Sequence, residues 1–298
     1  MSSLKDLKTR IGSVKNTQQT TKAMKMVSAA KLRRAQEAII AFRPYANEVA
    51  RLIQLTTILP QEEMSQSPLF ESRDHIEDSE KKILVVAITS DRGLCGNSNS
   101  SVVKEVSQWT VKNQKRYQSV DFVTIGKKGN ELLMRSFPEK VVHFQEFGPK
   151  TTFDLAKKLV SWVSKEFVEG RYDEVRLVYN EFKNALVQET QNQVFLPVSY
   201  TEVEVSDEPL KDELFLLKPS GAKLLERLRE KYFDVELFKA LLDAQASEHG
   251  SRMNAMENAT KNAGEMIQKL TLEYNKKRQA GITSELLEII AGAESQKG

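Results

Sequence analysis

LKDLKTRIGSVKNTQQTTKAMKMVSAAKLRRAQEAIIAFRPYANEVARLI, residues 4–53, has the spacing of one long helix. Its apolar residues recur at alternating intervals of three and four, which is typical of a coiled-coil seam. The seam comprises Leu4, Leu7, Ile11, Val14, Leu32, Ala35, Ile39, Phe42, Ala46, Val49 and Ile53. Gln18, Thr21, Lys25 and Ser28 occupy the same phase between the two apolar runs. The pattern therefore predicts a long helix whose seam is polar in its middle.

The other end of the chain repeats this pattern. Residues 220–298 contain no proline, although Gly250, Gly264 and Gly281 each cost a helix about 1 kcal/mol relative to alanine. A second seam comprises Leu228, Val235, Phe238, Leu242, Met256, Ala263, Ile267, Leu270 and Tyr274, and the polar segment QASEHGSRMN (245–254) interrupts it. Since the chain enters and leaves the middle region near residues 58 and 215, we expect the two helices to pair antiparallel.

Antiparallel pairing from those two points places Leu4 near Lys269 and leaves the last 20–25 residues or so without a partner helix. This overhang is apolar, since it includes Ile282, Leu286, Leu287, Ile289 and Ile290. A bare apolar end in water favours aggregation. Either another protein surrounds it, or it folds back or self-associates, and the pattern alone supports both.

The middle of the chain alternates strand and helix patterns. KILVVAITS (82–90) is a continuous apolar run, as expected for a buried strand. Further strand patterns cover 119–126, 140–147, 173–182 and 193–203, and helical patterns cover 99–115, 127–136 and 152–169. The alternation predicts a mainly parallel sheet with helices on its faces, and the last two strands are close enough to form an antiparallel hairpin.

The predicted fold class is thus mixed α/β: a long antiparallel coiled coil of the terminal helices plus a Rossmann-like α/β domain. We expect residues 1–59 and 210–298 to form the coiled coil, and residues 75–205 to form the α/β domain. No run approaches the roughly 18 apolar residues that span a bilayer, and the N-terminus lacks the apolar core of a signal peptide. We therefore expect a soluble protein without a membrane anchor.

Charge is distributed unevenly. The net charge is +3, but residues 1–60 alone carry +8, from 11 Lys/Arg against 3 Asp/Glu. Such a basic segment indicates an acidic partner. The single cysteine, Cys95, excludes an internal disulfide and a multi-cysteine zinc site.

Two glycine-bearing loops invite an enzymatic interpretation. SDRGLCGN (90–97) follows the first strand, as phosphate-binding turns do, and GKKG (126–129) follows the second. Neither matches G-x-G-x-x-G or G-x-x-x-x-G-K-[ST], so we favour structural turns. Cys95 has no nearby histidine to activate it, and His249 is better explained as a packing or hydrogen-bonding residue than as a ligand.

Three separated segments resemble one known family, the gamma subunits of F-type ATP synthase. They are IGSVKNTQQTTKAMKMVSAAKLRRAQ (11–36), SDRGLCGN (90–97) and ITSELLEIIAGA (282–293). The last fits the family signature through Ile282, Thr283, Glu285, Glu288, Gly292 and Ala293. Chloroplast members carry a redox insert with two cysteines, so the single Cys95 excludes that type of thiol control here.

The resemblance implies a central rotor shaft that has no catalytic residue, cofactor or metal of its own. The coiled coil would stand inside a hexamer of alpha and beta subunits, and the α/β domain would meet the epsilon subunit and the membrane ring of c subunits; delta belongs to the same complex. Proton flow would turn the shaft and drive the catalytic sites through ATP synthesis or hydrolysis. The expected location is the cytoplasmic face of a bacterial inner membrane, as a peripheral protein that does not insert.

The resemblance and the charge pattern together give candidate contact residues. The basic cluster would face acidic loops of the beta subunits, and the apolar overhang would turn in a sleeve at the top of the hexamer. The candidates are Met24, Lys25, Lys31, Arg33, Arg34 and Arg252, and at the overhang Ile282, Thr283, Glu285, Leu286, Leu287, Glu288 and Ile290.

Two other function classes fit parts of the sequence. A nucleic-acid-binding coiled coil would use the basic N-terminal helix, although no aromatic residue lies between Met1 and Ala41. A nucleotide-dependent enzyme would use the α/β domain, although that domain lacks a complete phosphate loop and an acid/base constellation. The resemblance favours neither, and we expect no nucleic acid partner.

Overall fold

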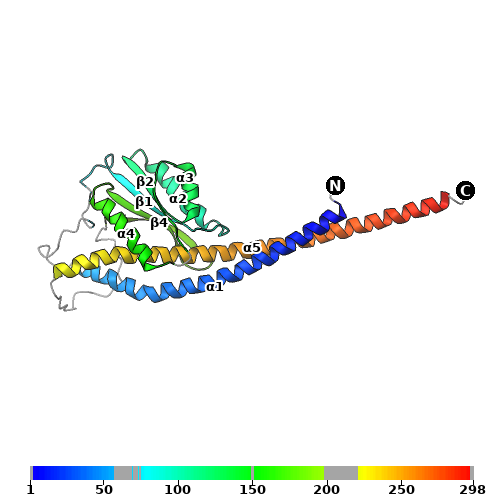
Figure 1. The fold of residues 1–298 in the computed structure, drawn as a ribbon, viewed down its shortest axis with the longest axis horizontal. Helices are drawn as coiled ribbons and strands as arrows, with labels where there is room; N and C mark the ends of the chain where they lie inside the picture. The colour runs from blue at the N-terminus through cyan, green and yellow to red at the C-terminus, as the bar shows by residue number, and fades with distance from the viewer. Residues whose placement is uncertain are drawn as a thin grey trace. The chain divides into compact units, whose positions relative to one another are not determined.

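The computed structural model describes residues 3–56, 69, 73, 75–148, 151–197 and 221–295 (Figure 1). Its residues group into two compact units: unit 1 is Met1–Ala29 with Arg252–Gly298, and unit 2 is Ala30–Ser251. Helices α1 (Leu4–Thr56) and α5 (Gly221–Ser295) each contribute to both units, so the division falls inside the two helices. The expected domain limits at 59, 205 and 210 lie outside the described residues.

The sheet of unit 2 has the strand order β3-β2-β1-β4-β5. Its strands are β1 (Lys82–Ile88), β2 (Ser119–Ile125), β3 (Val141–Gln145), β4 (Glu174–Phe182) and β5 (Gln188–Leu196). The β1–β2, β1–β4 and β2–β3 pairs are parallel, and β4 and β5 form an antiparallel hairpin. The predicted mainly parallel sheet with a terminal hairpin is confirmed.

The limits predicted for the last strand were wrong. It begins at Gln188, five residues before the apolar run that marked it in the sequence, and it ends at Leu196. The first part of β5, QETQNQ, is polar because it pairs at the edge of the sheet through hydrogen-bonding side chains, such as Asn192 Nδ2 to Glu105 Oε1 at 2.9 Å. Residues 198–203 of the prediction lie outside the described residues.

Helices cover both faces of the sheet, which explains the apolar run of β1. Helices α2 (Ser98–Asn113) and α3 (Lys127–Ser136) pack on the face that carries Ile83 and Val85, whereas α4 (Phe153–Val168) and α5 pack on the face of Leu84 and Val86. Six consecutive residues of β1 are buried. A strand buried on both faces has no polar positions to alternate with apolar ones.

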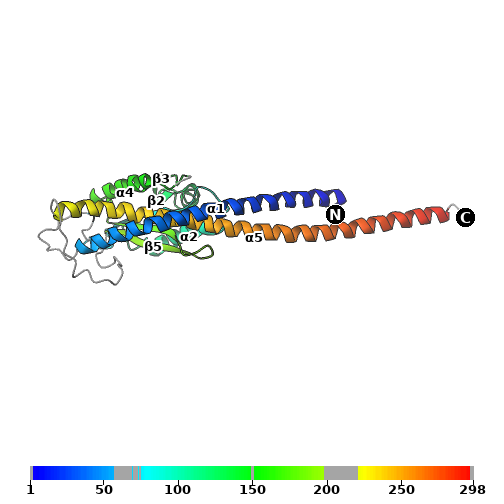
Figure 2. The same cartoon turned by 90° about the horizontal axis from the view of Figure 1, so that it is seen from below.

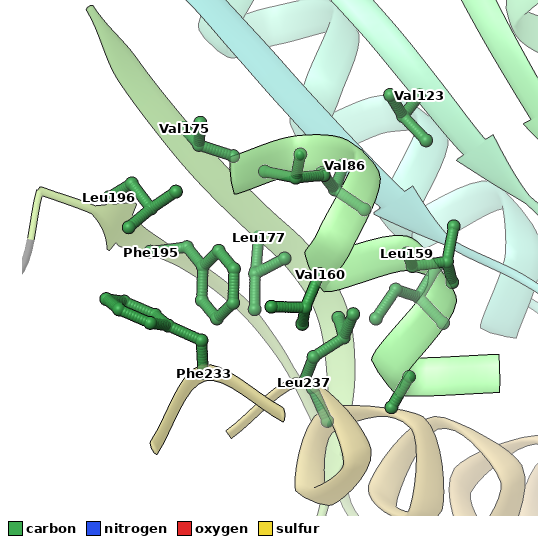
Figure 3. Close-up of a cluster of buried hydrophobic side chains, with 14 of the residues drawn as sticks. Val86, Val123, Leu159, Val160, Val175, Leu177, Phe195, Leu196, Phe233 and Leu237 are labelled. Atoms are coloured by element: carbon green, nitrogen blue, oxygen red, sulfur yellow. The ribbon is translucent and has the colours of Figure 1, made fainter. Parts of the chain in front are cut away.

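The larger core joins the sheet to α4 and α5 (Figure 3). Phe195 of β5 meets Phe233 of α5 edge to face, with ring centroids 5.5 Å apart, and Leu177 and Leu237 are fully buried beside them. Each such buried side chain contributes about 1.5–3 kcal/mol. This part of α5 is therefore a structural element of the α/β unit.

Within unit 1, α1 and α5 pair antiparallel. The hydroxyls of Thr21 and Thr260 lie 2.8 Å apart, and Lys25 Nζ lies 2.7 Å from Glu257 Oε1, so residue numbers rise along one helix as they fall along the other. The predicted seam of α1 is buried or half-buried from Leu7 onwards, including its polar middle, and Leu4 is 38% exposed. The heptad phase is thus confirmed.

The predicted register was wrong by about two turns. The Lys25–Glu257 pair, continued along both helices, places Leu4 beside residue 277 or so rather than beside Lys269. The prediction counted from residues 58 and 215, which lie outside the described residues. The part of α5 beyond α1 begins close to Gln279, which agrees with the predicted overhang of the last 20–25 residues or so.

Candidate partner-binding surfaces

The end of α5 is an apolar surface exposed to solvent. In unit 1, the helix continues past the first residues of α1 (Figures 1 and 2). The exposed fractions of Ile282, Leu286, Leu287, Ile289 and Ile290 lie between 49% and 67%. At about 100° per residue they span an arc of roughly 160° of the helix. Since α5 remains one helix to Ser295, the end does not fold back.

The other side of this helix end is acidic. Glu285 and Glu288 are exposed and lie outside the apolar arc. Thr283 lies within the arc, and its hydroxyl donates to the carbonyl of Gln279 at 3.0 Å. All the predicted contact residues of the overhang are therefore accessible, on one helix with an apolar face and an acidic face.

The basic candidates and their neighbour Met24 lie in both units. In unit 1, Met24 is half-buried and Lys25 pairs with Glu257. In unit 2, Lys31, Arg33 and Arg34 are exposed, and Arg33 Nε lies 3.0 Å from Glu37 Oε1 one turn along the same helix. The exposed arginines can reach a partner without rearrangement of the chain.

Arg252 differs from the other basic candidates. It is only 8% exposed, and it interacts within the chain. A partner could reach it only after its surroundings move. Residue spacing does not predict this burial, because the burial of one arginine depends on contacts far away along the chain.

The SDRGLCGN loop is built as a turn that satisfies its own polar groups. Asn99 accepts from the Ser90 amide at 2.9 Å through Oδ1, and its Nδ2 donates to Cys95 Sγ at 3.3 Å. Cys95 is 2% exposed. Asp91 accepts from the amides of Lys127 and Gly148 and so joins this loop to the ends of β2 and β3. The geometry favours the structural interpretation of the loop and of its thiol.

The second glycine loop has a packing role. Gly126 has φ +95°, and a Cβ there would lie 2.3 Å from the carbonyl oxygen of Thr89. A Cβ at Gly129 would lie 2.4 Å from the Thr89 hydroxyl, which accepts a hydrogen bond from the Gly129 amide at 3.0 Å. Both glycines allow α3 to approach the end of β1 closely.

Side-chain hydrogen bonds lie at the crevice where folds of this strand order bind nucleotides. That crevice lies at the carboxyl ends of β1 and β4, where the strand order reverses. Asn180 Nδ2 donates to the Ser98 carbonyl at 2.7 Å, and Asn180 Oδ1 accepts from the hydroxyls of Ser101 and Thr190 at 3.1 and 2.8 Å. These bonds tie the first turn of α2 to β4 and β5 at this point.

The ionisable groups with displaced pKa values do not form an acid/base site. Burial, and then the nearby Glu181 carboxylate, raise the pKa of Asp243 to about 6. Burial likewise raises the pKa of Asp121 and of Tyr172, whose hydroxyl donates to Asp121 at 3.2 Å. Among the described residues, no group of three or more His, Cys, Asp or Glu is placed to hold a metal, and no helix has the length and apolarity to span a bilayer.

Comparisons with known proteins agree over the whole chain. A model of the protein family described as ATP synthase matches residues 3–295. Two curated relatives, each named ATP synthase gamma chain, come from Bdellovibrio bacteriovorus (41% identical) and Trichlorobacter lovleyi (43% identical), and both alignments cover 100% of each chain.

Solved structures give the same result for the fold. A chain of the central stalk and c-ring structure of the Tetrahymena thermophila mitochondrial ATP synthase is 30% identical, with a TM-score of 0.60 over 80% of this chain and 99% of that one. A chain of the Euglena gracilis mitochondrial ATP synthase is 22% identical, with a TM-score of 0.67 over 98% and 94%, and supports the fold alone.

Proposed function

Because this chain belongs to the family of ATP synthase gamma chains, we propose that it is the rotating shaft that couples ion flow through a membrane ring to the nucleotide sites of an alpha/beta hexamer. Proton flow turns the ring and the attached shaft, and the asymmetric shaft drives the catalytic sites through different conformations in turn. The hexamer carries the nucleotide chemistry, and this chain is not itself catalytic.

The exposed apolar end of α5 carries the proposal. Five large apolar residues within nine positions, all at least 49% exposed, are unstable in water unless a partner covers them. A sleeve of alpha and beta subunits around residues 282–290 would bury them and still allow rotation, because apolar contact is not directional. Glu285 and Glu288, on the other side of the helix, would face the wider part of the sleeve.

The proposal also assigns a role to each region of the chain. Residues 1–59 and 210–298 act as the shaft, and residues 75–205 act as the foot, against the epsilon subunit and the c-subunit ring. The Tetrahymena thermophila structure, which is 30% identical, comprises the central stalk and the c-ring, and this supports the ring as a partner. The chain would then work at the cytoplasmic face of a bacterial inner membrane as a peripheral subunit.

The basic cluster is the second contact in the proposal. Met24, Lys25, Lys31, Arg33 and Arg34 would meet acidic loops of the beta subunits, with Arg252 recruited once it is uncovered. Exposed ion pairs contribute only about 0–1 kcal/mol each. Torque therefore arises from the asymmetric shape of the shaft and many weak contacts rather than from one ion pair.

Reconstitution tests the proposal. The full chain is mixed with alpha and beta subunits of a related bacterium, and the mass of the complex and its ATP hydrolysis are measured. We expect three alpha, three beta and one copy of this chain, with activity well above that of the hexamer alone. Failure to assemble with well-behaved subunits would contradict the proposal and leave nucleic acid and nucleotide binding to be tested.

Charge reversal tests the basic cluster. Changing Arg33 and Arg34 together to glutamate should weaken assembly or ATP-driven proton pumping, since both guanidinium groups are exposed and the new charges would repel acidic loops. Lys15→Glu with Lys22→Glu is the matched control, because these two lysines are also exposed on α1. Normal pumping by the arginine double variant would rule out this contact face.

A further inference from the structure

Residues 245–251 of the polar segment that interrupts the apolar seam of α5 belong to unit 2 and are buried or half-buried. Ser247 is fully buried, and His249 and Ser251 are 8% and 6% exposed. Polar groups are buried only at a cost unless they find hydrogen-bond partners. The partners of this segment therefore indicate what it does.

Three polar residues, one just before the segment and two within it, lie in one line on the helix. Asp243, Ser247 and Ser251 are spaced four residues apart, so they follow one face of α5; we call them the polar stripe. Ser247 Oγ donates to the carbonyl of Asn180 at 2.9 Å, and Ser251 Oγ donates to Gln188 Oε1 at 2.8 Å. The Asp243 carboxylate accepts from the amide of Phe182. All three bonds go to the β4–β5 hairpin.

The residues of the β4–β5 hairpin that bond to the polar stripe are themselves held in place by hydrogen bonds. Gln188 Nε2 donates to the carbonyls of Asn184 and Ala185 at 3.2 and 3.1 Å, so the amide that meets Ser251 has a set orientation. Asn180 is held through its side chain by Ser98 and Thr190. The hairpin also comes close to α5 at Gly250, where a Cβ would lie 3.5 Å from Ala185 O.

A rotation of α5 by one residue would lose all three bonds. In one direction it would bring Leu242, Ala246 and Gly250 to the hairpin, which offer no side-chain hydrogen bond. In the other direction it would bring Ala244, Glu248 and Arg252, whose sizes and charges differ from those of the polar stripe. The other contacts of α5 with the sheet, at Phe233, Leu237 and Leu241, are apolar and tolerate small rotations. Hydrogen bonds are directional, so the polar stripe restricts the angle of the helix.

We infer that the polar stripe locks the rotational position of α5 on the β4–β5 hairpin, so that torque passes between the helix and the sheet without slipping. Its consequence for coupling rests on the proposed function. Asp243, Ser247 and Ser251 are positioning residues in this scheme, because they act through α5 and touch no nucleotide. A purely apolar contact could bury the same area, but it would let α5 rotate against the hairpin under torque.

Hydrogen exchange on the full chain tests the lock by itself. Ser247→Ala and Ser251→Ala should each raise amide exchange over residues 243–251 by about tenfold, the ratio expected when one hydrogen bond is lost. Thr260→Val is the matched control, since it removes a hydroxyl contact of α5 with Thr21 in unit 1. Its exchange over 243–251 should equal that of the wild type. Unchanged exchange in both serine variants would overturn the inference.

Coupling in the assembled complex tests the consequence. Ser251→Ala should lose ATP-driven proton pumping against a gradient while ATP hydrolysis by the soluble complex is retained, and Ser251→Thr, which keeps the hydroxyl, should restore pumping. Gln188→Ala breaks the same bond from the hairpin, so Gln188→Ala with Ser251→Ala should pump no worse than either single variant. Pumping equal to the wild type in these variants would overturn the inference.

The outcomes separate the two proposals. If the wild-type chain fails to assemble, the proposed function fails, and the exchange experiment still decides whether the stripe fixes the helix. If the Ser247→Ala chain fails to fold, Gln188→Ala decides, because Gln188 is only half-buried on the hairpin.

Discussion

Two stretches of the same helix have opposite surroundings. Residues 233–251 of α5 are buried or half-buried at every position except Lys239, whereas residues 279–292 are exposed at every position except Gly281. Both stretches are rich in large apolar side chains, so composition does not explain the difference. The first stretch finds its partner in the chain's own sheet, and the second finds none within the described residues. The proposed sleeve of alpha and beta subunits would supply the partner that the second stretch lacks among the described residues.

Removing one leucine from each stretch tests most directly whether their surroundings differ. Leu237→Ala should lower the free energy of unfolding by about 2–5 kcal/mol, because Leu237 is almost fully buried and its loss leaves a cavity. Leu287→Ala should change it by less than about 0.5 kcal/mol, because Leu287 is 61% exposed. Urea unfolding of the full chain measures both.

The ranking of these two variants should reverse in the assembled complex, where Leu287→Ala should have the larger effect. Leu287→Ala should weaken assembly with alpha and beta subunits although its fold is intact, since the proposed sleeve contacts that side chain. Equal and large losses of stability in both variants would mean that the chain itself covers the helix end. The claim that the end awaits a partner would then be untenable.

Replacing Asp243 tests how the buried stretch tolerates a charge. The pKa of Asp243 is about 6 in the folded chain against an ordinary value of 3.8, so the folded state binds the proton more tightly than the unfolded state. The free energy of unfolding therefore falls as the pH rises from about 4 to 6, and the deficit is complete above that range. Asp243→Asn removes this deficit and keeps an oxygen that can accept from Phe182.

The asparagine variant should therefore be more stable than the wild type at pH 8, by about 3 kcal/mol, and the gain should vanish as the pH approaches 4. Thermal or urea unfolding at a series of pH values measures it. Glu236→Gln is a suitable control, since Glu236 lies on the same helix, also acts on Tyr179 and is half-buried. A gain that is independent of pH would show that charge burial is not the cause.

The helix and strand that were predicted correctly depend on the spacing of residues close together in the sequence. The phase of α1 follows from its spacing of three and four, and β1 follows from its unbroken apolar run. The first half of β5 was missed because its polar residues are satisfied by partners far away in the chain, such as Glu105. Periodicity cannot detect a partner of that kind.

The candidate site was predictable to the same extent. The apolar overhang could be identified from Ile282 to Ile290, because exposure there follows from the lack of a partner helix. The polar segment 245–254 looked like an interruption of the seam, whereas its serines bond to the β4–β5 hairpin. The burial of Arg252 could not be predicted either, since it depends on packing rather than on spacing.

The smallest expected effect concerns the polar seam of unit 1. Lys25→Ala removes the ion pair with Glu257, whose two side chains are 37% and 55% exposed, so the loss of stability should be below about 1 kcal/mol and should shrink at high salt. Leu7→Ala, at a buried position of the same seam, should cost more than the lysine variant. Urea unfolding at 0.05 and 0.5 M salt (about 14 and 4 Å of screening length) separates the two effects. A salt-insensitive loss at Lys25 as large as that at Leu7 would mean that the polar seam holds the helix pair together; the expected result assigns that role to the apolar positions and leaves the lysine available to a partner.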